Sequence, residues 1–486
     1  MAPPASPTTS LVWFFRRSNF SAAGAISFPA RHRHLLAHNR NMHPRELANS
    51  ICETLQLHGF QAFLVGGCVR DLLLGREPAD YDVATDATPD RVMQLFPDSV
   101  AVGAQFGVVL VTHLASKVEV ATFRRDVGYS DGRHPDQVIY ATQPEDDVSR
   151  RDFTINGLLM RHNSREVLDF VGGQADLKAG VVRAIGDPAR RFTEDKLRML
   201  RAVRFAARFG YSIDPNTFAS IRRHAPEIHA VSAERIHEEL YKLLTEGAAR
   251  RGFELLDESG LLQEVLPEIT AMKGVPQPPE YHPEGDVWIH TRLMLEGLPS
   301  GSSRTLAWGV LLHDVGKPRT FRSASLTGDR IRFDSHVEVG VRMVGEICQR
   351  LRFSKDDTEQ IQSLVANHMK FKDVAQMRKS TLKRFVRLRH FDEHLELHRL
   401  DCLASHGRLD AYHMVRDFLA ETPPEQVRPT RLLTGDDLSE MGYVPGPAFQ
   451  TMLSALEDAQ LEGSLTTRED ARAFVQEHYP LAKVGR

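Results

Sequence analysis

The stretch Phe63-Leu-Val-Gly-Gly-Cys-Val-Arg-Asp71, followed by Asp80-Tyr-Asp82, decides the fold of the N-terminal part of this chain. Two carboxylates one residue apart on a strand project to the same face. Such a pair can hold Mg²⁺, which prefers oxygen ligands and shares them with phosphate. The glycine pair lets the backbone approach a triphosphate closely, and Arg70 can form a fork onto phosphate oxygens. The stretch therefore predicts a site for nucleotidyl transfer.

In that site we expect Asp80 and Asp82 to hold two Mg²⁺ ions, one near an attacking hydroxyl and one on the leaving pyrophosphate. Glu119, on a neighbouring predicted strand, is a candidate for a third carboxylate. An exposed strand residue without a role in the site is an equally good interpretation of Glu119.

The surrounding pattern alternates between helix and strand and predicts an α+β fold. This alternation within about 110 residues predicts one mixed sheet with helices on a face. Residues 126–145 are loop-like, because Gly, Asp, Pro and His cluster there without a period. Beyond Arg150 the pattern is overwhelmingly helical, with linkers at Pro276–Pro279 and Thr422–Glu425. The expected elements before residue 126 are helices at 43–59, 69–74 and 88–95 and strands at 63–65, 80–84, 108–112 and 117–123.

Composition excludes several classes of protein. Hydrophobic residues make up 42% and charged residues 26% of the 486 residues, as in globular proteins. The net charge is −3, so a nucleic acid would have to meet a local basic patch. Four scattered cysteines without a Cys-X-X-Cys motif indicate reduced thiols in the cytoplasm and no zinc finger. No apolar run approaches the ~18–20 residues that span a membrane.

The first 41 residues differ from the rest, because they contain arginines among Ser, Ala and Pro but no Asp or Glu. Their composition is typical of an organellar transit peptide. The alternative is a true start at Met42, just before the first helical pattern. In both cases we expect this segment to be disordered and exclude it from the fold.

Arginines recur in two later segments, Arg150-Arg-Asp-Phe-Thr-Ile-Asn156 and the helical stretch from Glu194 to Arg204. Paired arginines ahead of a helical segment are suited to phosphate or ribose contact. In the second segment Arg198, Arg201 and Arg204 follow Asp195 at steps of three. An Asp and an Arg of fixed geometry can bind the edge of cytosine or adenine, both of which offer an amine beside an acceptor. The alternative is a solvated basic face with one ion pair worth about 0.5 kcal/mol.

Six motifs in order resemble class II tRNA nucleotidyltransferases, the family of CCA-adding enzymes and bacterial poly(A) polymerases. The resemblance covers about residues 45–270 and implies a polymerase-β-like nucleotidyltransferase head and a helical neck. It implies triphosphate contact by Gly67 and Arg70, Mg²⁺ at Asp80 and Asp82, and nucleotide binding by Arg151, Asp195, Arg198, Arg201 and Arg204. The motifs are 64–71, 80–82, 150–156, Asp169-Phe-Val-Gly-Gly-Gln-Ala-Asp-Leu177, 194–198 and Ser232-Ala-Glu-Arg-Ile-His-Glu-Glu239.

The stretch from Arg124 to Pro135 is similar to the flexible loop with which this family switches from C to A. Its length disfavours an enzyme that adds only CC. An enzyme that adds only the final A stays open, whereas a poly(A) polymerase would carry a longer basic extension.

A second set of residues resembles the HD phosphohydrolase superfamily over about residues 282–405. The resemblance implies one metal held by His290, His313, Asp314 and Asp401, with His336 and His368 available for a second. His282 is a rival to His290. The metal would supply hydroxide and polarise a phosphate, and Mg, Mn, Ni and Fe all remain open.

The sequence thus predicts a cytoplasmic enzyme that adds C, C and A to the tRNA 3′ end from CTP and ATP, with an additional phosphodiesterase or phosphatase activity. The alternatives are an A-adding enzyme and an HD nucleotide or cyclic-phosphate hydrolase with a nucleotide-binding head. Contact with tRNA is expected from basic residues of the neck and C-terminal part, while the oligomeric state is not determined. The expected domains are a head (42–160), a helical neck (161–275), an HD domain (282–405) and a helical tail (406–486).

Overall fold

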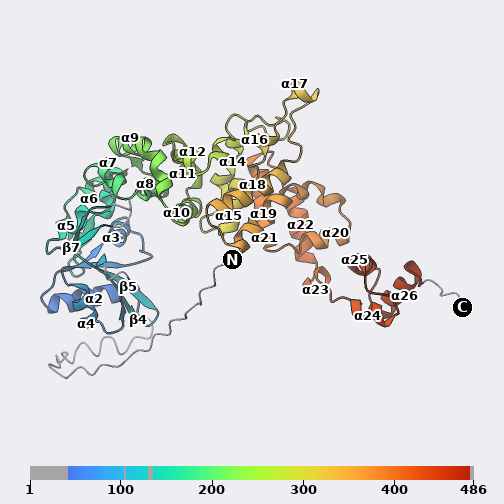
Figure 1. The fold of residues 1–486 in the computed structure, drawn as a ribbon, viewed down its shortest axis with the longest axis horizontal. Coiled ribbons are helices and arrows are strands. Elements are labelled where there is room, and N and C mark those ends of the chain that lie inside the picture. The colour runs from blue at the N-terminus through green and yellow to red at the C-terminus, as the bar shows by residue number, and fades with distance from the viewer. Residues whose placement is uncertain (1–41, 103–105, 130–134, 482–486) are drawn as a thin grey trace, which may run out of the picture.

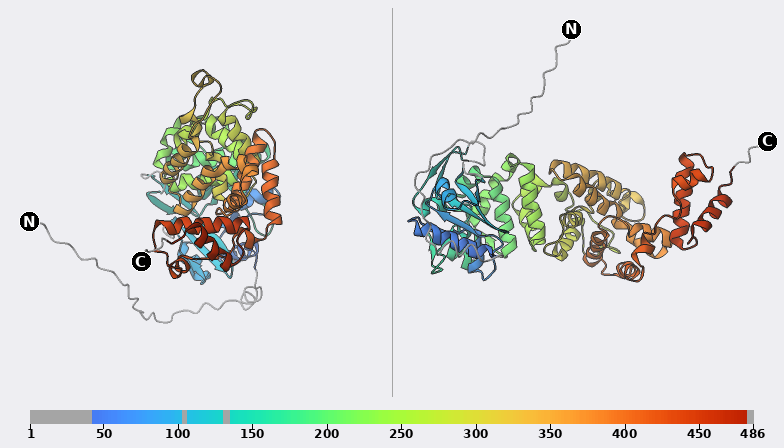
Figure 2. Two further views of the ribbon diagram at one scale, coloured as in Figure 1. Left: turned by 90° about the vertical axis from the view of Figure 1, so that its right-hand side faces the viewer. Right: turned by 90° about the horizontal axis from the view of Figure 1, so that it is seen from below.

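The computed structural model describes residues 42–102, 106–129 and 135–481. Head, neck, HD helices and tail follow one another in a row from one end of the molecule to the other (Figure 1). The view from below shows the same order, with the sheet at one end and the last helices at the other (Figure 2, right). The chain is therefore extended, and the predicted α+β class with a mixed sheet at its start is confirmed.

The head is built on one seven-stranded mixed sheet with the order β3-β4-β5-β2-β1-β8-β9. Only β2 and β5 pair in parallel, and the other neighbours are antiparallel. The strands are β1 (Ala62–Val65), β2 (Asp82–Thr85), β3 (Ser99–Val100), β4 (Val108–His113), β5 (Ser116–Thr122), β8 (Leu158–Met160) and β9 (Val167–Asp169).

Helices cover both faces of this sheet. Helix α2 (Pro44–Leu57) begins with a capping box at His43 and buries Leu47, Ile51 and Leu55 against valines of β2, β4 and β5. On the other face a smaller cluster joins β1 to Val148 of α5 (Pro144–Ser149). Two further helices of the head are α3 (Gly67–Leu73) and α4 (Pro89–Leu95).

Three expectations about the head were wrong in detail. Asp80 precedes β2, so it does not share a strand with Asp82. The segment expected to be a loop contains a hairpin of β6 (Arg124–Val127) and β7 (Gln137–Tyr140). The strands were missed because they are short and the segment is rich in residues typical of turns. The sheet also continues past residue 160, because β9 pairs with β8. These three-residue strands are too short to show a period of two within a region that we expected to be helical.

The neck is helical, apart from one short parallel pair of β10 (Val181–Val182) and β11 (Ser212–Ile213). Its longest helices, α8 and α10, pack against each other. The neck helices are α6 (Gly173–Ala179), α7 (Pro188–Glu194), α8 (Leu197–Phe209), α9 (Pro215–His224), α10 (Ala233–Thr245), α11 (Ala249–Glu258), α12 (Leu261–Val265) and α13 (Pro267–Thr270).

The HD helices share one hydrophobic core with the neck, which runs from Phe153 to Ala404 across the expected linker. These helices are α14 (Val287–Gly297), α15 (Arg304–Leu312), α16 (Lys317–Thr320), α17 (Ala324–Thr327), α18 (His336–Arg350), α19 (Lys355–Asn367), the 3-10 helix η4 (His368–Gln376), α20 (Lys379–Phe385) and α21 (Phe391–Ala404). Two further 3-10 helices, η2 (Thr154–Asn156) and η3 (Ala225–Ala230), lie earlier in the chain.

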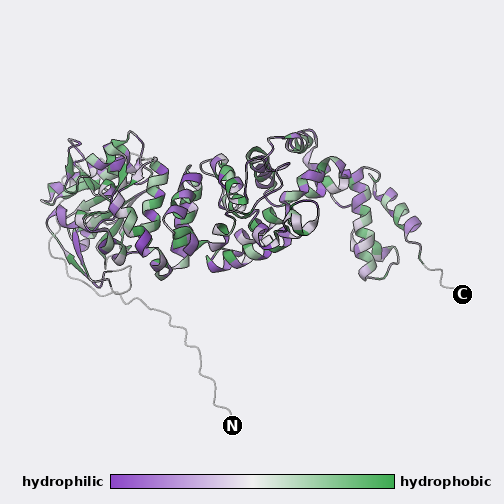
Figure 3. Ribbon diagram, turned by 90° about the horizontal axis from the view of Figure 1, so that it is seen from above, coloured by the Kyte–Doolittle hydropathy of each residue, from purple (hydrophilic) through white to green (hydrophobic). Residues whose placement is uncertain are grey.

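The tail has a small core of its own around Leu438, Leu456 and Val475. Apolar and polar residues alternate along helices throughout the molecule (Figure 3), and none of the helices in the described ranges is long and apolar enough to cross a membrane. The last helices are α22 (Asp410–Glu421), α23 (Pro424–Val427), α24 (Gly435–Glu440), α25 (Pro447–Glu462) and α26 (Arg468–His478).

Candidate active sites

The first candidate site lies where β2 and β5 run side by side in the head. The parallel register places Asp82 directly opposite Glu119, and Asp80 lies just before β2 at the surface. Burial and the charges of Glu119 and Asp80 raise the pKa of Asp82 to about 6, whereas Arg151 acts to lower it. Three carboxylates that repel one another with a single nearby arginine fit a divalent cation, which would relieve this repulsion.

The glycine pair and Arg70 lie at the start of α3, beside these carboxylates. Gly66 has a φ of 77°, and a Cβ there would lie 3.1 Å from Arg151 Nη1, so the turn requires glycine. Gly67 follows as the first residue of α3. Arg70 is 5% exposed and donates to Asn156 Oδ1 at 2.6 Å and to Asp71 Oδ1 at 2.9 Å.

Arg70 also stacks on the neck. Its guanidinium carbon lies 4.7 Å from the ring centre of Phe209 and 5.3 Å from that of Phe205, both on α8. These cation–π contacts join the predicted phosphate-binding helix of the head to the arginine helix of the neck.

Arg151 is oriented by Asp147, a fully buried residue of α5 that the sequence interpretation missed. Asp147 accepts hydrogen bonds from Arg150 at 2.6 Å and Arg151 at 2.9 Å. Burial alone would raise the pKa of Asp147, but the two arginines lower it overall. The signal was present in the sequence, because an acid three and four residues before an arginine pair lies on the same helical face.

Asp152 connects the head to the arginine helix. Its Oδ2 accepts from Arg201 Nε at 2.9 Å and Nη2 at 2.7 Å, while its Oδ1 accepts from Asn156. Burial would raise the pKa of Asp152, but Arg201 and Asn156 lower it to about 2. Asp152 therefore remains a carboxylate and holds Arg201 in one orientation.

The predicted nucleotide-binding residues of α8 have different surroundings. Asp195 accepts from Arg235 at 2.8 Å and from Leu197 N at 3.1 Å. Arg198 donates to Glu194 Oε2 at 2.9 Å and to the Arg150 carbonyl at 3.0 Å. Arg198 therefore lies beside the residues that follow α5, whereas Asp195 is paired with α10 of the neck.

Arg201 and Arg204 differ in how accessible their guanidinium groups are. The Arg201 side chain is 34% exposed, whereas that of Arg204 is 7% exposed and is held by Glu239 at 2.7 Å and Glu246 at 3.2 Å. The structure thus brings Arg198 and Arg201 against Arg150 and Asp152 of the head. Asp195 is paired with Arg235 of the neck, and Arg204 is paired with acids inside the neck.

The base of the β6–β7 hairpin approaches this group. Asp126 pairs with Arg124 at 2.9 Å, lies 3.8 Å from Arg150, and accepts from Tyr129 Oη at 2.8 Å. Burial, Asp126 and the nearby Glu194 raise the pKa of Tyr129, and Arg198 acts against them. The hairpin therefore adjoins the arginine helix, while residues 130–134 of the predicted switch loop lie outside the described residues.

The second candidate site brings together all six predicted HD residues. Asp314 lies at its centre, with Oδ2 at 3.1 Å from His313 Nε2 and Oδ1 at 4.0 Å and 3.9 Å from the Nε2 atoms of His336 and His368. His290 Nε2 lies 3.2 Å from Asp401 Oδ1. Two groups of three within this set, His290–His313–Asp314 and Asp314–His336–His368, have ligand atoms close enough to share an ion.

The chemistry of these donors fits a metal ion. Nδ1 of His313, His336 and His368 contacts a backbone carbonyl at 2.7–2.9 Å, so Nδ1 must donate and Nε2 carries the lone pair. In the described chain these three buried Nε2 atoms and Asp314 Oδ1 have no hydrogen-bond partner. Buried polar atoms are normally paired, and a metal would supply the missing partner.

Lys317, Gln277 and Glu284 surround this centre and were not predicted as parts of it. Lys317 Nζ lies 2.7 Å from Asp314 Oδ2 and donates to Gln277 Oε1 at 2.6 Å. Glu284 Oε1 accepts from both His290 Nδ1 at 2.7 Å and His282 Nδ1 at 2.9 Å. His282 is thus a neighbour of His290 on the other side of Glu284.

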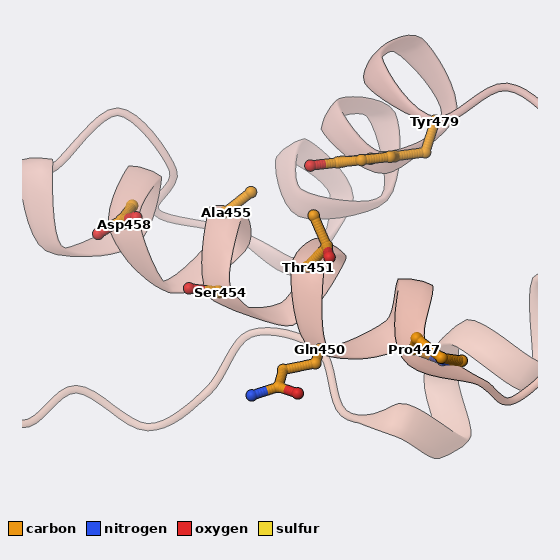
Figure 4. Close-up of a pocket in the computed structure, with 7 residues that line it drawn as sticks. All are labelled: Pro447, Gln450, Thr451, Ser454, Ala455, Asp458 and Tyr479. Carbon is orange, nitrogen blue, oxygen red and sulfur yellow. The ribbon is translucent and has the colours of Figure 1, made fainter.

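A groove on the tail has no comparable chemistry. Figure 4 shows it between α25 and the end of α26, at the opposite end of the molecule from the head. It is lined by Pro447, Gln450, Thr451, Ser454, Ala455, Asp458 and Tyr479.

Comparison with known proteins gives three matches to family models. Residues 62–183 match the poly A polymerase head domain, 210–273 match the probable RNA and SrmB-binding site of polymerase A, and 285–397 match the HD domain. A CCA-adding enzyme of Levilactobacillus brevis is 31% identical over 430 residues, which cover 88% of this chain and 96% of that enzyme. This chain belongs to the family of CCA-adding enzymes.

Two further members of the CCA-adding enzyme family show how the similarity is distributed. The CCA-adding enzyme of Latilactobacillus sakei is 38% identical over 270 residues, 54% of this chain and 68% of that one. The crystal structure of the Bacillus stearothermophilus CCA-adding enzyme in complex with CTP has a TM-score of 0.69 at 25% identity and covers 90% of this chain and 98% of that one. The predicted resemblance to the family is confirmed, and CCA-adding enzymes are nucleotidyltransferases.

Proposed function

We propose that this chain adds C, C and A to the 3′ end of tRNA, using CTP and ATP, at the junction of head and neck. The observation that carries the proposal is the cluster of Asp80, Asp82 and Glu119 beside Arg151 and the Asp152–Arg201 pair. The 3′ hydroxyl of the tRNA attacks the α-phosphate in line, and pyrophosphate leaves.

The metal of this site is proposed to be Mg²⁺, held by Asp80 and Asp82 with Glu119 as the third carboxylate. When bound, it supplies positive charge to the reacting hydroxyl and the phosphates. Gly67 presents its backbone to the triphosphate. Arg70 and Arg151 would neutralise part of the negative charge of the triphosphate. Both are already oriented by acids of the chain.

We propose that Asp195, Arg198 and Arg201 select the base. A carboxylate accepts from the exocyclic amine of cytosine or adenine, and a guanidinium donates to the neighbouring ring nitrogen or carbonyl. Arg204 serves this group by holding α8 against Glu239 and Glu246, because its side chain is buried there. The incoming CTP or ATP would be selected by protein side chains and not by a nucleic-acid template.

Contact with tRNA outside the active site is proposed at Arg222 and Arg223 on α9. Both are exposed, and within the described ranges neither forms an ion pair. By contrast, Arg250, Arg251 and Arg384 are paired with acids of the chain. Contacts with phosphate would make tRNA affinity fall steeply with salt.

The test is incubation with three tRNA transcripts, which lack CCA, CA or only A. Incorporation into all three, with C added from CTP before A from ATP, is expected. Incorporation into the last transcript alone would identify an A-adding enzyme and overturn the proposal. A transcript that already ends in CCA is the matched control.

We infer a second activity, hydrolysis of phosphate esters, at the HD centre. The observation that carries it is the set of buried Nε2 atoms that face Asp314 without a partner. His290, His313, Asp314 and Asp401 would hold one metal, and His336 and His368 are proposed for a second. A metal there lowers the pKa of bound water and polarises the phosphate.

The test of the second activity is hydrolysis of bis-p-nitrophenyl phosphate and of a nucleoside 2′,3′-cyclic phosphate by chelator-treated protein, with Mg²⁺, Mn²⁺, Ni²⁺ or Fe²⁺ restored one at a time. Turnover that returns with one metal and is absent from a His313→Ala variant is expected. Turnover that persists in that variant would refute the assignment.

Domain limits and location complete the proposal. The head is extended to Asp169, where β9 ends, so the neck is taken to begin at residue 170. The HD domain and tail keep the limits expected from the sequence. Cytoplasmic location is proposed, because Cys52, Cys68, Cys348 and Cys402 are all free and buried.

A further inference from the structure

Among the four histidines of the HD centre, His290 is oriented differently from the others. His313, His336 and His368 each donate Nδ1–H to the carbonyl of the residue three positions earlier. For His290 that carbonyl belongs to Val287, and it already accepts from the Thr291 hydroxyl at 2.8 Å. Nδ1 of His290 contacts a side chain instead of this carbonyl.

Glu284 provides this side chain. Its Oε1 lies 2.7 Å from His290 Nδ1, the His290 side chain is 0% exposed, and that of Glu284 is 7% exposed. Because a carboxylate can only accept, Nδ1 of His290 is the donor and Nε2 is left to face Asp401 and the metal cluster. A carboxylate partner makes an imidazole a more basic ligand than a carbonyl partner does.

His282 in turn holds Glu284. Its Nδ1 donates to the same Oε1 at 2.9 Å, and its ring stands nearly perpendicular to that of His290, at 81° and 5.0 Å between centres. The side chain of His282 is 17% exposed, so this second hydrogen bond closes the outer side of the network.

The backbone around Glu284 is fixed on its C-terminal side. Gly285 has a φ of 129°, and a Cβ there would lie 2.9 Å from Ile289 Cδ1, so no other residue fits without displacement. Asp286 then caps α14 through Ile289 N at 2.7 Å and accepts from Gly274 N at 2.7 Å. The connection between neck and HD helices is thereby held at both ends.

The same connection reaches the centre at a second point, through Gln277. This residue is 4% exposed and accepts from Lys317 Nζ at 2.6 Å, while the same Nζ lies 2.7 Å from Asp314 Oδ2. The connection thus contacts one expected metal ligand, His290, and also Lys317, which lies beside Asp314.

We propose that Glu284 is the positioning residue for His290, and that the connecting segment 277–286 is the outer layer of the HD metal centre. The inference rests on the proposed metal site of the HD domain. Metal affinity at that site then depends on a carboxylate outside the six residues that the sequence pattern assigns to it.

The test measures Co²⁺ binding by calorimetry and by visible absorption on the full chain. Asp80→Asn and Asp82→Asn are present in every variant, so that the head contributes no metal binding. In this background Glu284→Gln and Glu284→Ala are compared with Glu280→Gln, an exposed acid of the same segment, and with His313→Ala, which removes a ligand.

Removal of an outer partner typically costs 10–100-fold in metal affinity. We expect about 10-fold weaker binding for Glu284→Gln, which keeps an acceptor without charge, and about 100-fold for Glu284→Ala. At saturating Co²⁺ the absorption bands should match those of the background protein, because the ligands are unchanged. Glu280→Gln should not change the affinity.

Three outcomes would overturn the inference, and they are distinguishable. Unchanged Co²⁺ affinity in Glu284→Ala would show that Glu284 does not position His290. Altered bands at saturation in that variant would make Glu284 itself a ligand. Absence of Co²⁺ binding in the background protein, or equal binding in His313→Ala, would instead refute the proposed HD metal site on which the inference rests.

Discussion

The two candidate metal sites of this molecule differ in how completely the protein prepares them. In the head, Asp80 is exposed and precedes its strand, and Asp82 and Glu119 face each other as mutually repelling carboxylates. In the HD domain, three ring nitrogens are aimed inward by hydrogen bonds on their far sides. The head site suits a metal that arrives with a nucleotide, whereas the HD centre suits a metal that stays bound between turnovers.

The largest effect expected from this difference concerns Asp80 and Asp82. Asp80→Ala or Asp82→Ala should lower CCA addition about 10³-fold or more, because metal charge at the reacting phosphate is worth several kcal/mol. Hydrolysis at the HD centre should remain within about twofold. The measurement is incorporation of labelled CTP and ATP alongside phosphodiester hydrolysis by the same preparation. Loss of both activities would show that the two sites are not separate.

The converse changes, His313→Ala and Asp314→Asn, test the HD centre. Hydrolysis should fall about 10²–10³-fold, and the increase in melting temperature caused by added Mn²⁺ should disappear, because a metal that binds only the folded chain stabilises it. CCA addition should persist. His413→Ala, an exposed histidine on α22, is the matched control. A metal-induced increase that survives in His313→Ala would place the stable metal elsewhere.

A smaller effect is expected at the pair of Asp152 and Arg201, which joins head to neck. Asp152→Asn and Arg201→Met should each lower kcat/KM for CTP about 10–100-fold, because Arg201 loses its fixed orientation. The double variant should lose little more than either single variant, with a coupling of about 1–3 kcal/mol. Strict additivity in this double-mutant cycle would show that the two residues act independently.

The smallest expected effect is on stability in acid. The pKa of Asp152 falls from 3.8 to about 2 on folding, so its contribution is complete above about pH 4 and is lost as the pH falls through about 2. That shift corresponds to about 2 kcal/mol. The difference in unfolding free energy between the wild type and Asp152→Asn, measured by urea denaturation, should therefore shrink between pH 6 and pH 3. A constant difference would contradict this linkage.

The sequence predicted residues whose role follows from their chemical type and order. Asp82 lies near Asp80 and Glu119 in the head, and the six HD residues lie together in a separate centre, as the ordered motifs implied. The partners that orient them were missed. The spacing of Asp147 before Arg150 and Arg151 was a local signal, whereas Glu284 looks like an ordinary acid until the backbone brings it beside a histidine. Order along the chain identifies groups that could bind, while contacts between distant segments decide which groups are held.

Two further failures have the same physical origin. Arg201 and Arg204 have the same spacing in the helix, yet one is a third exposed and the other is buried against two acids. The proline-rich connection at 276–279 reads as a linker, but the core of the neck continues into the HD helices beneath it. In both cases the burial of one helix against another decides the outcome, and no local pattern records it.

The stacking of Arg70 on Phe205 and Phe209 fixes the distance between the start of α3 and helix α8. It ties the start of α3, where a triphosphate would end, to α8, where a base would be recognised. Because these contacts hold α3 and α8 together, the distance between the two helices does not adjust freely to a purine or to a pyrimidine. The difference in size between adenine and cytosine would then be absorbed by side chains and by the β6–β7 hairpin beside Arg198. Replacing Phe209 with a small residue should weaken the contact between α3 and α8 and reduce the accuracy with which the enzyme distinguishes CTP from ATP.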